Sequence, residues 1–454
     1  MLSCPLDFRY GRAPAKRIFS ESHKLELMLR VEAALAKAQA DVRIIPKEAA
    51  DEIARAAGSG RVTVEKVAKA EAKVKHDIMG LVQTLADACK GDAGKYIHLG
   101  ATSNDIIDTA TGLQLKEFLA LLRDDLGEVC RVLAALAKAH RNTVMVGRTH
   151  GQHALPITFG LKIAVFLDEF MRHVWRLGQA ETRLCVGKMM GAVGTGAGFG
   201  PKALKIQDAV MGELGLAAET GATQVVARDR YVELGSLLTM VSLTCERFAL
   251  EIRNLQRTEI GEVEEAFGKD QVGSSTMAQK RNPITAENIC GLGRVLRSNL
   301  HVFTDSSLLW HERDLSNSSA ERFALPHACI LADEVLAKTA KLAAGLRVRK
   351  DRMRSNLEMT RGLVMAEAVI VALVAKGMGR QEAHELVRKV SHSLPEGRHF
   401  VEGLWKSSKV RKLMKRKAIE AALDPAKYLG VAGKIVDEIV GRQAEWAKAA
   451  GKTA

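Results

Sequence analysis

The chain has 454 residues, of which 47% are hydrophobic and 26% charged, a balance that excludes a disordered polymer. Its nine prolines exclude a collagen-like or proline-rich chain, and the 4% share of aromatic residues favours helix over sheet. The net charge of +14 is compatible with anionic partners, which include nucleic acid, membranes and anionic metabolites.

The seven cysteines are scattered along the chain and form no CxxC pair, which argues against a zinc site or a disulfide framework. We therefore expect reduced thiols in a cytoplasmic protein. The N-terminal stretch MLSCPLDFRYGR has no apolar core, so no secretory signal is expected. The longest apolar stretch, residues 363–375, contains Glu367 and is too short to span a bilayer, so we interpret it as a buried helix.

The first hundred residues carry three helical patterns. Apolar residues recur at helical spacing over 22–43, a second helix is expected at 46–57, and a third over 63–88. A loop follows at 91–104. These elements predict a small N-terminal helical domain covering residues 1–104.

Much longer helical patterns follow, and helices of such length need partners because propensity alone does not stabilise them. They predict a central long-helix bundle domain over residues 105–345. From about residue 346 the chain becomes basic and shorter helices resume, which predicts a C-terminal helical domain over 346–454. The expected class is all-α. The long patterns cover residues 106–140, 156–188, 229–265 and 284–308.

Two polar segments precede the long helices. The KHD segment at 75–77 lies inside a helical pattern, where His76 taken alone is more often solvated or packed than catalytic. Thr102 and Ser103 precede a helix whose first turn or cap contains Asp105. Capping is the simpler interpretation of this segment, and an anion cradle of free N–H groups is the functional one.

The segment GRTHGQHALPITFG at 147–160 contains two histidines. His150 is followed by Gly151, and Pro156 is expected to open a long helix. His150 and His153 could suggest a metal pair. No third ligand lies at a useful spacing and HExxH is absent, so no metal site is expected.

The segment at 268–288 is the most informative one. Its Gly-rich, Ser-containing loop ends in Lys280, Arg281 and Asn282, and Pro283 then begins a helix. Positive charge and amide donors beside a helix N-terminus can hold a carboxylate whose charge grows during a reaction. An ordinary linker between two helices would not need both the glycine and the Lys/Asn pair, which favours a functional interpretation.

A further polar segment lies at 310–322. Ser318 and Arg322 are four residues apart and share one face of a helix. Together with Arg313, the two guanidinium groups suit the recognition of phosphate or carboxylate. The plainer alternative is a run of exposed ion pairs with Glu312, Asp314 and Glu321.

These motifs together resemble the fumarase/aspartase superfamily. The stretch GSSTMAQKRNP at 273–283 is similar to the GSSxMPxKxNP loop of that superfamily. Within it, the chain is most similar to the adenylosuccinate lyase family, and the supporting segments follow the family's order over most of the chain. They are residues 8–12, 75–77, 100–110, 147–160, Gln224, 228–230 and 310–322.

The resemblance implies a three-domain all-α fold whose long helices assemble into a homotetramer, with active sites that take residues from three subunits. It implies β-elimination of fumarate from adenylosuccinate to give AMP. It also implies the same cleavage of the succinyl-carboxamide ribotide of purine biosynthesis (SAICAR) to AICAR. No metal or organic cofactor is implied, and no nucleic acid or membrane partner is expected.

The resemblance also assigns catalytic roles. Ser274 corresponds to the general base that removes the Cβ proton. His150 corresponds to the general acid that protonates the leaving nitrogen, and Glu287 to its carboxylate partner. Lys280 and Asn282 match residues that hold the succinyl carboxylate.

On the nucleotide side, His76 matches the second active-site histidine of the family, which is placed near the phosphate. Three positions depart from the family pattern: Ala278 replaces a proline, Gln279 a residue that is often His or Tyr, and Lys75 a common Arg. Ala278 should make the loop less stiff, and Lys75 offers a point charge in place of a guanidinium fork. The substrate-binding positions are Arg9, Tyr10, Lys75, Asp77, Thr102, Ser103, Gln224, Arg313, Ser318 and Arg322.

Two rival interpretations remain open. One is another superfamily member, such as 3-carboxy-cis,cis-muconate cycloisomerase or argininosuccinate lyase, although the histidine of GRTHG argues against the cycloisomerase, which tends to carry Trp there. The other is a basic helical protein that binds nucleic acid, suggested by the charge runs at 347–354 and 406–416. Because interleaved aromatic residues and a nucleic-acid motif are missing, a solvated basic face is the expected role of these runs.

Overall fold

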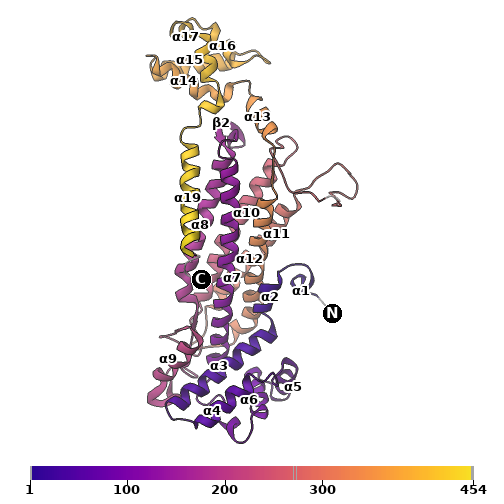
Figure 1. Cartoon of the computed structure of the whole chain (residues 1–454), viewed down its shortest axis with the longest axis vertical. Helices are drawn as coiled ribbons and strands as arrows, with labels where there is room; N and C mark the ends of the chain where they lie inside the picture. The colour runs from indigo at the N-terminus through magenta and orange to yellow at the C-terminus, as the bar shows by residue number, and fades with distance from the viewer. Residues whose placement is uncertain (1–2, 269, 272, 451–454) are drawn as a thin grey trace. The chain divides into compact units, whose positions relative to one another are not determined.

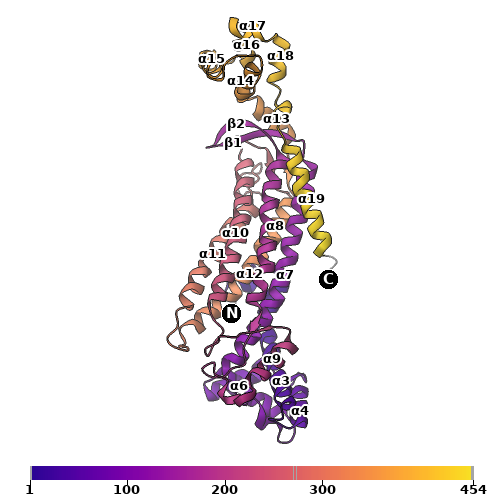
Figure 2. The same ribbon diagram turned by 90° about the vertical axis from the view of Figure 1, so that its left-hand side faces the viewer.

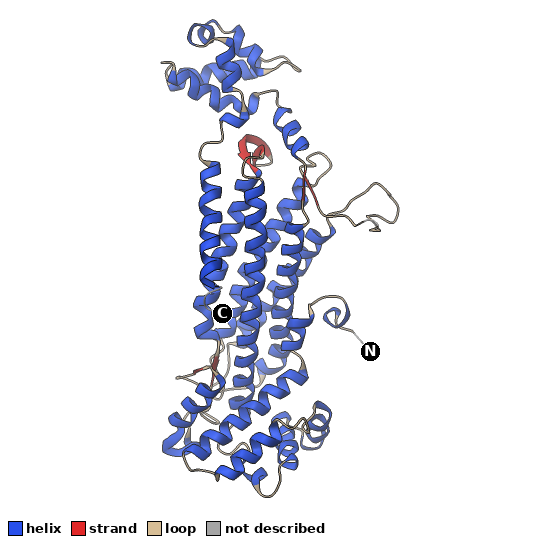
Figure 3. Cartoon of the chain, viewed as in Figure 1, coloured by secondary structure: helices blue, strands red, loops and turns tan. Residues whose placement is uncertain are grey.

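The structure, a computed structural model, describes residues 3–268, 270–271 and 273–450. Helices make up most of the described chain, with a few short strands (Figure 3), so the predicted all-α class is confirmed. The chain divides into two compact units, and each of its five long helices contributes residues to both. The first unit comprises residues up to 126, 173–243 and 291–336, and the second comprises 127–172, 244–290 and 337 onward. The division into three contiguous domains stays a prediction.

The first unit begins with a cluster of short helices. Ser20 caps α3 by accepting a hydrogen bond from the His23 N–H (3.3 Å), and Leu25 and Leu29 of this helix pack into a core with Leu81 and Leu85. The expected helices at 22–43 and 46–57 are confirmed. The elements are α1 (Pro5–Phe8), α2 (Ala13–Ile18), α3 (Glu21–Asp41), α4 (Lys47–Ala57), α5 (Val64–Val74), α6 (Asp77–Ala88) and the 3-10 helix η1 (Ala93–Tyr96).

The single helix expected over residues 63–88 is wrong. The chain turns between α5 and α6, where Lys75 ends α5 in the left-handed region (φ 57°). His76 is therefore not inside a helix: it caps α6, and its Nδ1 accepts a hydrogen bond from the Met79 N–H (3.4 Å). The helix-forming composition of this segment hid the break, because one left-handed residue suffices to end a helix.

The predicted long helices are confirmed, and their ends differ from the prediction by a few residues at most, except that α10 ends ten residues early. Within the first unit, the parts of α7, α10 and α12 lie side by side (Figures 1 and 2). Gly235 of α10 makes room for the ring of Phe303 on α11, since a Cβ at residue 235 would clash with that ring. The long helices are α7 (Ser103–Ala139), α8 (Phe159–Leu184), α10 (Asp229–Leu255), α11 (Ile284–Ser306) and α12 (Ser316–Ala344).

Short elements join the long helices in the first unit. Strands β3 and β4 pair in parallel, and the Gly-rich stretch and α9 lie between them in the chain. These elements are β3 (Val186–Gly187), η2 (Ala197–Lys202), α9 (Ala203–Leu214) and β4 (Ala217–Ala218).

The second unit contains a β-hairpin that the sequence did not predict. Strands β1 (Val144–Thr149) and β2 (Gln152–Thr158) pair antiparallel, so Pro156 lies in a strand and does not open a helix. Proline is tolerated because both strands of a lone hairpin are edge strands. Helix α8 begins three residues later, where Thr158 Oγ1 accepts a hydrogen bond from the Leu161 N–H (3.1 Å).

The rest of the second unit is helical. Helix α19 lies beside α8 there (Figures 1 and 2), and Arg442 Nη2 donates to Asp168 Oδ1 at 2.9 Å. No helix among the described residues combines the length and the apolar character that a membrane span requires. The elements are β5 (Val263–Glu264), β6 (Arg347–Val348), α13 (Lys350–Glu358), η3 (Leu363–Met365), α14 (Ala366–Ala375), α15 (Arg380–Ser393), α16 (Phe400–Lys406), α17 (Ser408–Leu413), α18 (Arg416–Ala422), η4 (Pro425–Lys427) and α19 (Ala432–Ala450).

Candidate functional site

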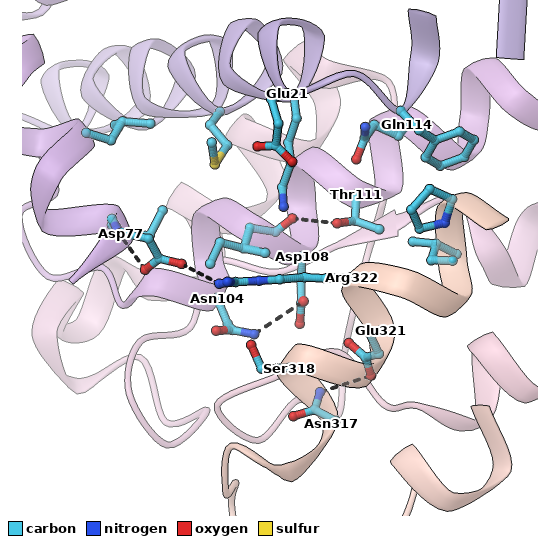
Figure 4. Close-up of a pocket in the computed structure, with 18 of the residues that line it drawn as sticks. Glu21, Asp77, Asn104, Asp108, Thr111, Gln114, Asn317, Ser318, Glu321 and Arg322 are labelled. Carbon is cyan, nitrogen blue, oxygen red and sulfur yellow. Dashed lines mark hydrogen bonds and ion pairs between the residues drawn. The ribbon is translucent and has the colours of Figure 1, made fainter. Parts of the chain in front are cut away.

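A cavity of about 410 Å³ in the first unit brings several predicted binding residues together. Asp77 of α6, Arg313, and Ser318 and Arg322 of α12 line it. Figure 4 shows the Arg322 side chain reaching toward Asp77, and its Nη2 donates to Asp77 Oδ2 at 3.0 Å. The cavity therefore presents a guanidinium and a hydroxyl at one end, which are groups that can hold a phosphate.

Gln224 and Arg313 are joined directly. Arg313 Nη1 donates to Gln224 Oε1 (2.9 Å), and Gln224 Nε2 donates to the Ala192 carbonyl oxygen (3.0 Å). The Nε of Arg313 is buried and has no hydrogen-bond partner in the structure. The two residues therefore hold each other in place, and the Nε–H of Arg313 is a donor that this pairing leaves unused.

The segment before α7 is tied down by Asp105. This buried carboxylate accepts from the Thr102 N–H (2.8 Å) and from Lys188 Nζ (2.5 Å), and it also accepts from the N–H groups of Met190 and Gly191. Asp105 thereby satisfies donors that an anion would otherwise use. The capping interpretation of this residue is supported, and Thr102 and Ser103 stay half-buried beside it.

Seven further residues that were predicted on the nucleotide side lie outside the lining of this cavity. His76 and Lys75 are exposed at the turn before α6, and the Nδ1 of His76 lies 3.5 Å from Asp77 Oδ1. Arg9 is exposed and its guanidinium lies 5.8 Å from the Tyr10 ring centre. The remaining residues outside the lining are Thr102, Ser103 and Gln224 as described above.

The second unit contains the loop with the predicted base. Asn282 Nδ2 donates to the Gly273 carbonyl oxygen (2.9 Å), which closes the loop at its foot. Only glycine fits at residue 273, because a Cβ there would clash with the Lys280 carbonyl oxygen. Ser274 Oγ accepts hydrogen bonds from the N–H groups of Thr276 (3.3 Å) and Met277 (3.1 Å). Two backbone donors therefore point at the oxygen that would carry a negative charge if this serine lost its proton.

A cleft of about 690 Å³ adjoins this loop in the second unit. Lys280, Asn282 and Glu287 line it, together with Arg253 and Arg257 of α10. With Arg281, four cationic side chains line this cleft, and such a group suits a ligand with more than one carboxylate. At the start of α11 the N–H groups of residues 285 and 286 are taken up by the Glu265 carboxylate (3.0 and 2.7 Å), so these donors are already used.

His150 lies at the tip of the β1–β2 hairpin. His150 (φ 53°) and Gly151 (φ 73°) form a two-residue turn, and Thr149 pairs with Gln152 on either side of it. Positive φ at both central residues is the signature of a type I′ hairpin turn. The turn leaves the imidazole exposed. Within the described residues of one chain, His150 forms no hydrogen bond or ion pair with Ser274 or Glu287.

A buried ion pair holds the hairpin. Arg148 of β1 donates two hydrogen bonds to Glu262 (2.9 and 2.8 Å), and Asn356 Nδ2 also donates to this fully buried carboxylate (2.8 Å). Burial and the positive charge of Arg148 lower the pKa of His153, whose Nδ1 has no hydrogen-bond partner in the structure. The described residues contain no group of three or more His, Cys, Asp or Glu side chains suited to a metal ion.

Replacing Glu262 by glutamine is expected to lower the free energy of unfolding by ~3 kcal/mol, because it leaves the Arg148 guanidinium buried without a counter-charge. Urea unfolding followed by circular dichroism measures the loss. The matched control is Glu128→Gln, which removes the carboxylate of the exposed Arg131 pair and should cost less than ~1 kcal/mol. Equal losses in the two variants would contradict a special role for the buried pair.

Sequence reasoning missed one set of polar residues. Asp108, Arg228 and Glu321 form a buried ion-pair network beside the cavity in the first unit. The alternative that Glu321 belongs to exposed pairs is wrong, because its partner is Arg228 and its side chain is 12% exposed. Asp314 is also engaged locally, since it accepts from the N–H groups of Ser316 and Trp310 (both 2.7 Å). The only sequence signal for the network was the RDR segment at 228–230.

Two family models match the chain. One, described as "Lyase", covers residues 9–296, and the other, described as "Adenylosuccinate lyase C-terminus", covers residues 362–439. Together they account for most of both units.

Similar proteins cover nearly the whole chain. An adenylosuccinate lyase of Pyrococcus abyssi is 49% identical over 96% of this chain and 97% of its own length. An adenylosuccinate lyase of Methanocaldococcus jannaschii is 45% identical over 96% and 95% of the two chains.

Among solved structures, a fumarate lyase from Mesorhizobium sp. BNC1 superposes with a TM-score of 0.87, 36% identity and coverage of 95% and 98%. A 3-carboxy-cis,cis-muconate lactonizing enzyme from Pseudomonas putida superposes with a TM-score of 0.88, 34% identity and coverage of 97% and 99%.

Proposed function

The chain belongs to the adenylosuccinate lyase family, and from this membership we propose that it cleaves adenylosuccinate to AMP and fumarate. By the same chemistry it cleaves SAICAR to AICAR and fumarate, so that it acts twice in purine biosynthesis. The observation that carries the proposal is the cationic cleft next to the Ser274 loop, in a chain whose relatives are named for this activity.

The first half of the reaction needs a base and a stabilised carboxylate. The proton on Cβ of the succinyl group lies α to a carboxylate and is very weakly acidic, and its removal places extra negative charge on that carboxylate. Ser274 takes this proton. The N–H groups of Thr276 and Met277 stabilise its deprotonated form, because hydrogen bonds to a charged form favour that form. Lys280 and Asn282 bind the carboxylate whose charge grows.

The second half needs an acid for the departing nitrogen. The electron pair of the broken C–N bond goes to the purine amine, and His150 supplies a proton there as the general acid. Glu287 supports the charged imidazole. The reaction needs no cofactor, because the proton removed from Cβ and the proton delivered to nitrogen balance.

The nucleotide is bound by the residues of the first unit. Ser318, Arg322 and Arg313 bind the phosphate, and Asp77 orients Arg322 through the observed ion pair. His76 assists near the phosphate. The remaining binding positions are Arg9, Tyr10, Lys75, Thr102, Ser103 and Gln224.

A panel of three substrates tests the proposal. The purified protein is incubated separately with adenylosuccinate, argininosuccinate and 3-carboxy-cis,cis-muconate, and loss of substrate is followed by chromatography. The expected result is turnover of adenylosuccinate alone. Lactonisation of carboxymuconate with adenylosuccinate unchanged would replace the proposal by the activity named for the Pseudomonas putida structure.

The proposal includes a homotetramer with active sites shared between subunits. Exposed apolar side chains on the long helices support it: Met240 and Leu243 on α10 and Val295 on α11 would otherwise face water. The absence of a hydrogen bond between His150 and Ser274 in the described residues of one chain is also consistent with sharing. A cytoplasmic location fits the seven cysteines, all of which are free thiols.

Subunit mixing tests the shared site. Two inactive variants, Ser274→Ala and His150→Asn, are mixed under conditions that exchange subunits, and activity is assayed after reassembly. Some sites then combine a native Ser274 with a native His150, so partial recovery of activity is expected. No recovery, in a mixture shown by mass spectrometry to contain hybrid tetramers, would rule sharing out.

A further inference from the structure

Arg228 lies just before α10, and its buried side chain connects two helices of the first unit. Its Nη1 and Nη2 donate to the two oxygens of Asp108 on α7 (2.9 and 3.0 Å). Its Nε and Nη2 donate to the two oxygens of Glu321 on α12 (2.8 and 3.2 Å). The side chain is 4% exposed, so these bonds form away from water.

All five N–H donors of Arg228 are used inside the protein. Besides the four bonds to carboxylates, Nη1 donates to the Val226 carbonyl oxygen (2.8 Å). A guanidinium has five N–H donors and no acceptor, so none remains for a ligand. Although Arg228 borders the cavity, its contribution must therefore pass through the residues it contacts.

The carboxylates are themselves held by neighbours that border the cavity. Asn104 Nδ2 donates to Asp108 Oδ1 (3.3 Å) and Asn317 Nδ2 donates to Glu321 Oε1 (2.9 Å), as Figure 4 shows. Burial raises the pKa of Glu321, and the charge of Arg228 opposes that shift. The network is thus a closed set of paired charges, which a single substitution would leave unbalanced.

The position of Glu321 on α12 gives the network a functional consequence. Glu321 lies between Ser318 and Arg322, the two residues of this helix that are proposed to bind phosphate. A shift of Glu321 would rotate or translate the first turns of α12 and move both groups. Misplacement of a binding group by about 1 Å can cost up to about a hundredfold in rate or affinity.

We propose that Arg228 is a positioning residue that holds the start of α12 against α7, so that Ser318 and Arg322 face the nucleotide phosphate. The inference rests on the proposed function, because it takes the phosphate-binding role of these two residues from it. It adds a residue that touches no substrate and yet sets the affinity for the nucleotide half of the substrate.

The test is Arg228→Lys, which keeps the positive charge but offers three donors from one point and cannot donate two hydrogen bonds to each of the two carboxylates. We expect the KM for adenylosuccinate and the inhibition constant of AMP to rise about tenfold or more. The kcat and the inhibition constant of fumarate should change less than about threefold, because the proposed fumarate-binding residues lie on other segments. A purely structural loss would not affect the two products so differently.

Two further variants complete the experiment. Arg230→Lys is the matched control: Arg230 lies two residues further along, and its Nη2 is 2.6 Å from the buried Glu219. The other hydrogen bonds of Glu219 join it to Gly187 and Gln207, neither of which is a proposed binding residue. The kinetic constants of Arg230→Lys should match those of the wild type. Glu321→Gln keeps the shape of the partner and removes its charge, and it should raise the same two constants as Arg228→Lys. If Arg228→Lys does not fold, Glu321→Gln decides the question.

Two results would overturn the inference: an equal rise in the inhibition constants of AMP and fumarate, or a fall in kcat with unchanged KM. An effect of Arg230→Lys as large as that of Arg228→Lys would also do so. By contrast, a wild-type protein that leaves adenylosuccinate intact overturns the proposed function itself, so the two failures are distinguishable.

Discussion

Replacing Ser274 by alanine is expected to lower kcat by about 10³–10⁴-fold while the protein keeps its fold and assembly. The substitution removes the oxygen that accepts hydrogen bonds from the N–H groups of Thr276 and Met277, and with it the proposed base. KM should change little, because Lys280 and Asn282 still bind the carboxylate. Steady-state kinetics with adenylosuccinate measure both constants.

The neighbouring serine is the control for this prediction. Ser275 lies in the same loop and is exposed, and no hydrogen bond of its side chain is observed, so Ser275→Ala should retain most of the activity. If Ser274→Ala instead kept near-native turnover, or if it dissociated the assembly, Ser274 would be a structural residue and the base would have to be sought elsewhere.

Replacing His150 by asparagine is expected to lower kcat by about 10²–10⁴-fold. Asparagine is the variant of choice because residue 150 has a φ of 53°, and Asn-Gly is the preferred pair for a type I′ turn. The hairpin should therefore form as before, and the melting temperature should not fall. The loss of activity can then be assigned to the imidazole.

Chemical rescue adds a second readout for His150. A general acid delivers a proton to the leaving nitrogen, so added imidazole, which can deliver one in its place, should restore part of the rate of His150→Asn. The rate of the wild type should not rise when imidazole is added. An absence of rescue would mean that another group protonates the leaving nitrogen.

The long helices could be predicted because the sequence pattern of each helix lies within the helix itself. Residues 106–140 and 284–308 show apolar periodicity and few helix breakers, and α7 and α11 follow these bounds closely. The Ser274 loop could also be recognised, because Gly273, Lys280 and Asn282 lie within ten residues of one another. Apolar periodicity and short motifs are visible in a single sequence, and they suffice to predict features of this kind.

The hairpin and the turn at Lys75 could not be predicted with the same means. His-Gly is a weaker turn signal than Asn-Gly, and Pro156 in the first turn of a helix was an equally acceptable reading of the sequence. Lys75 occupies the left-handed region although glycine usually takes that position. In both places tertiary packing overrides the local preference.

The Arg228 network could not be predicted from the sequence, and the reason is different. Its carboxylate partners are 120 and 93 residues away along the chain, and nothing in either segment marks them as a pair. A charged residue in a helical pattern is usually exposed. Only the fold shows that Asp108 and Glu321 face one buried guanidinium, and this is why the positioning role of Arg228 follows from the structure and not from the sequence.

The most direct measurement of the central claim uses adenylosuccinate that carries two deuterium atoms on Cβ of its succinyl group. The protein is incubated with this substrate in ordinary water, and the products are quantified by mass spectrometry. If Cβ–H removal and C–N cleavage take place as proposed, AMP and fumarate appear in equal amounts and the fumarate carries one deuterium. Intact substrate after prolonged incubation with folded, assembled protein would contradict the account.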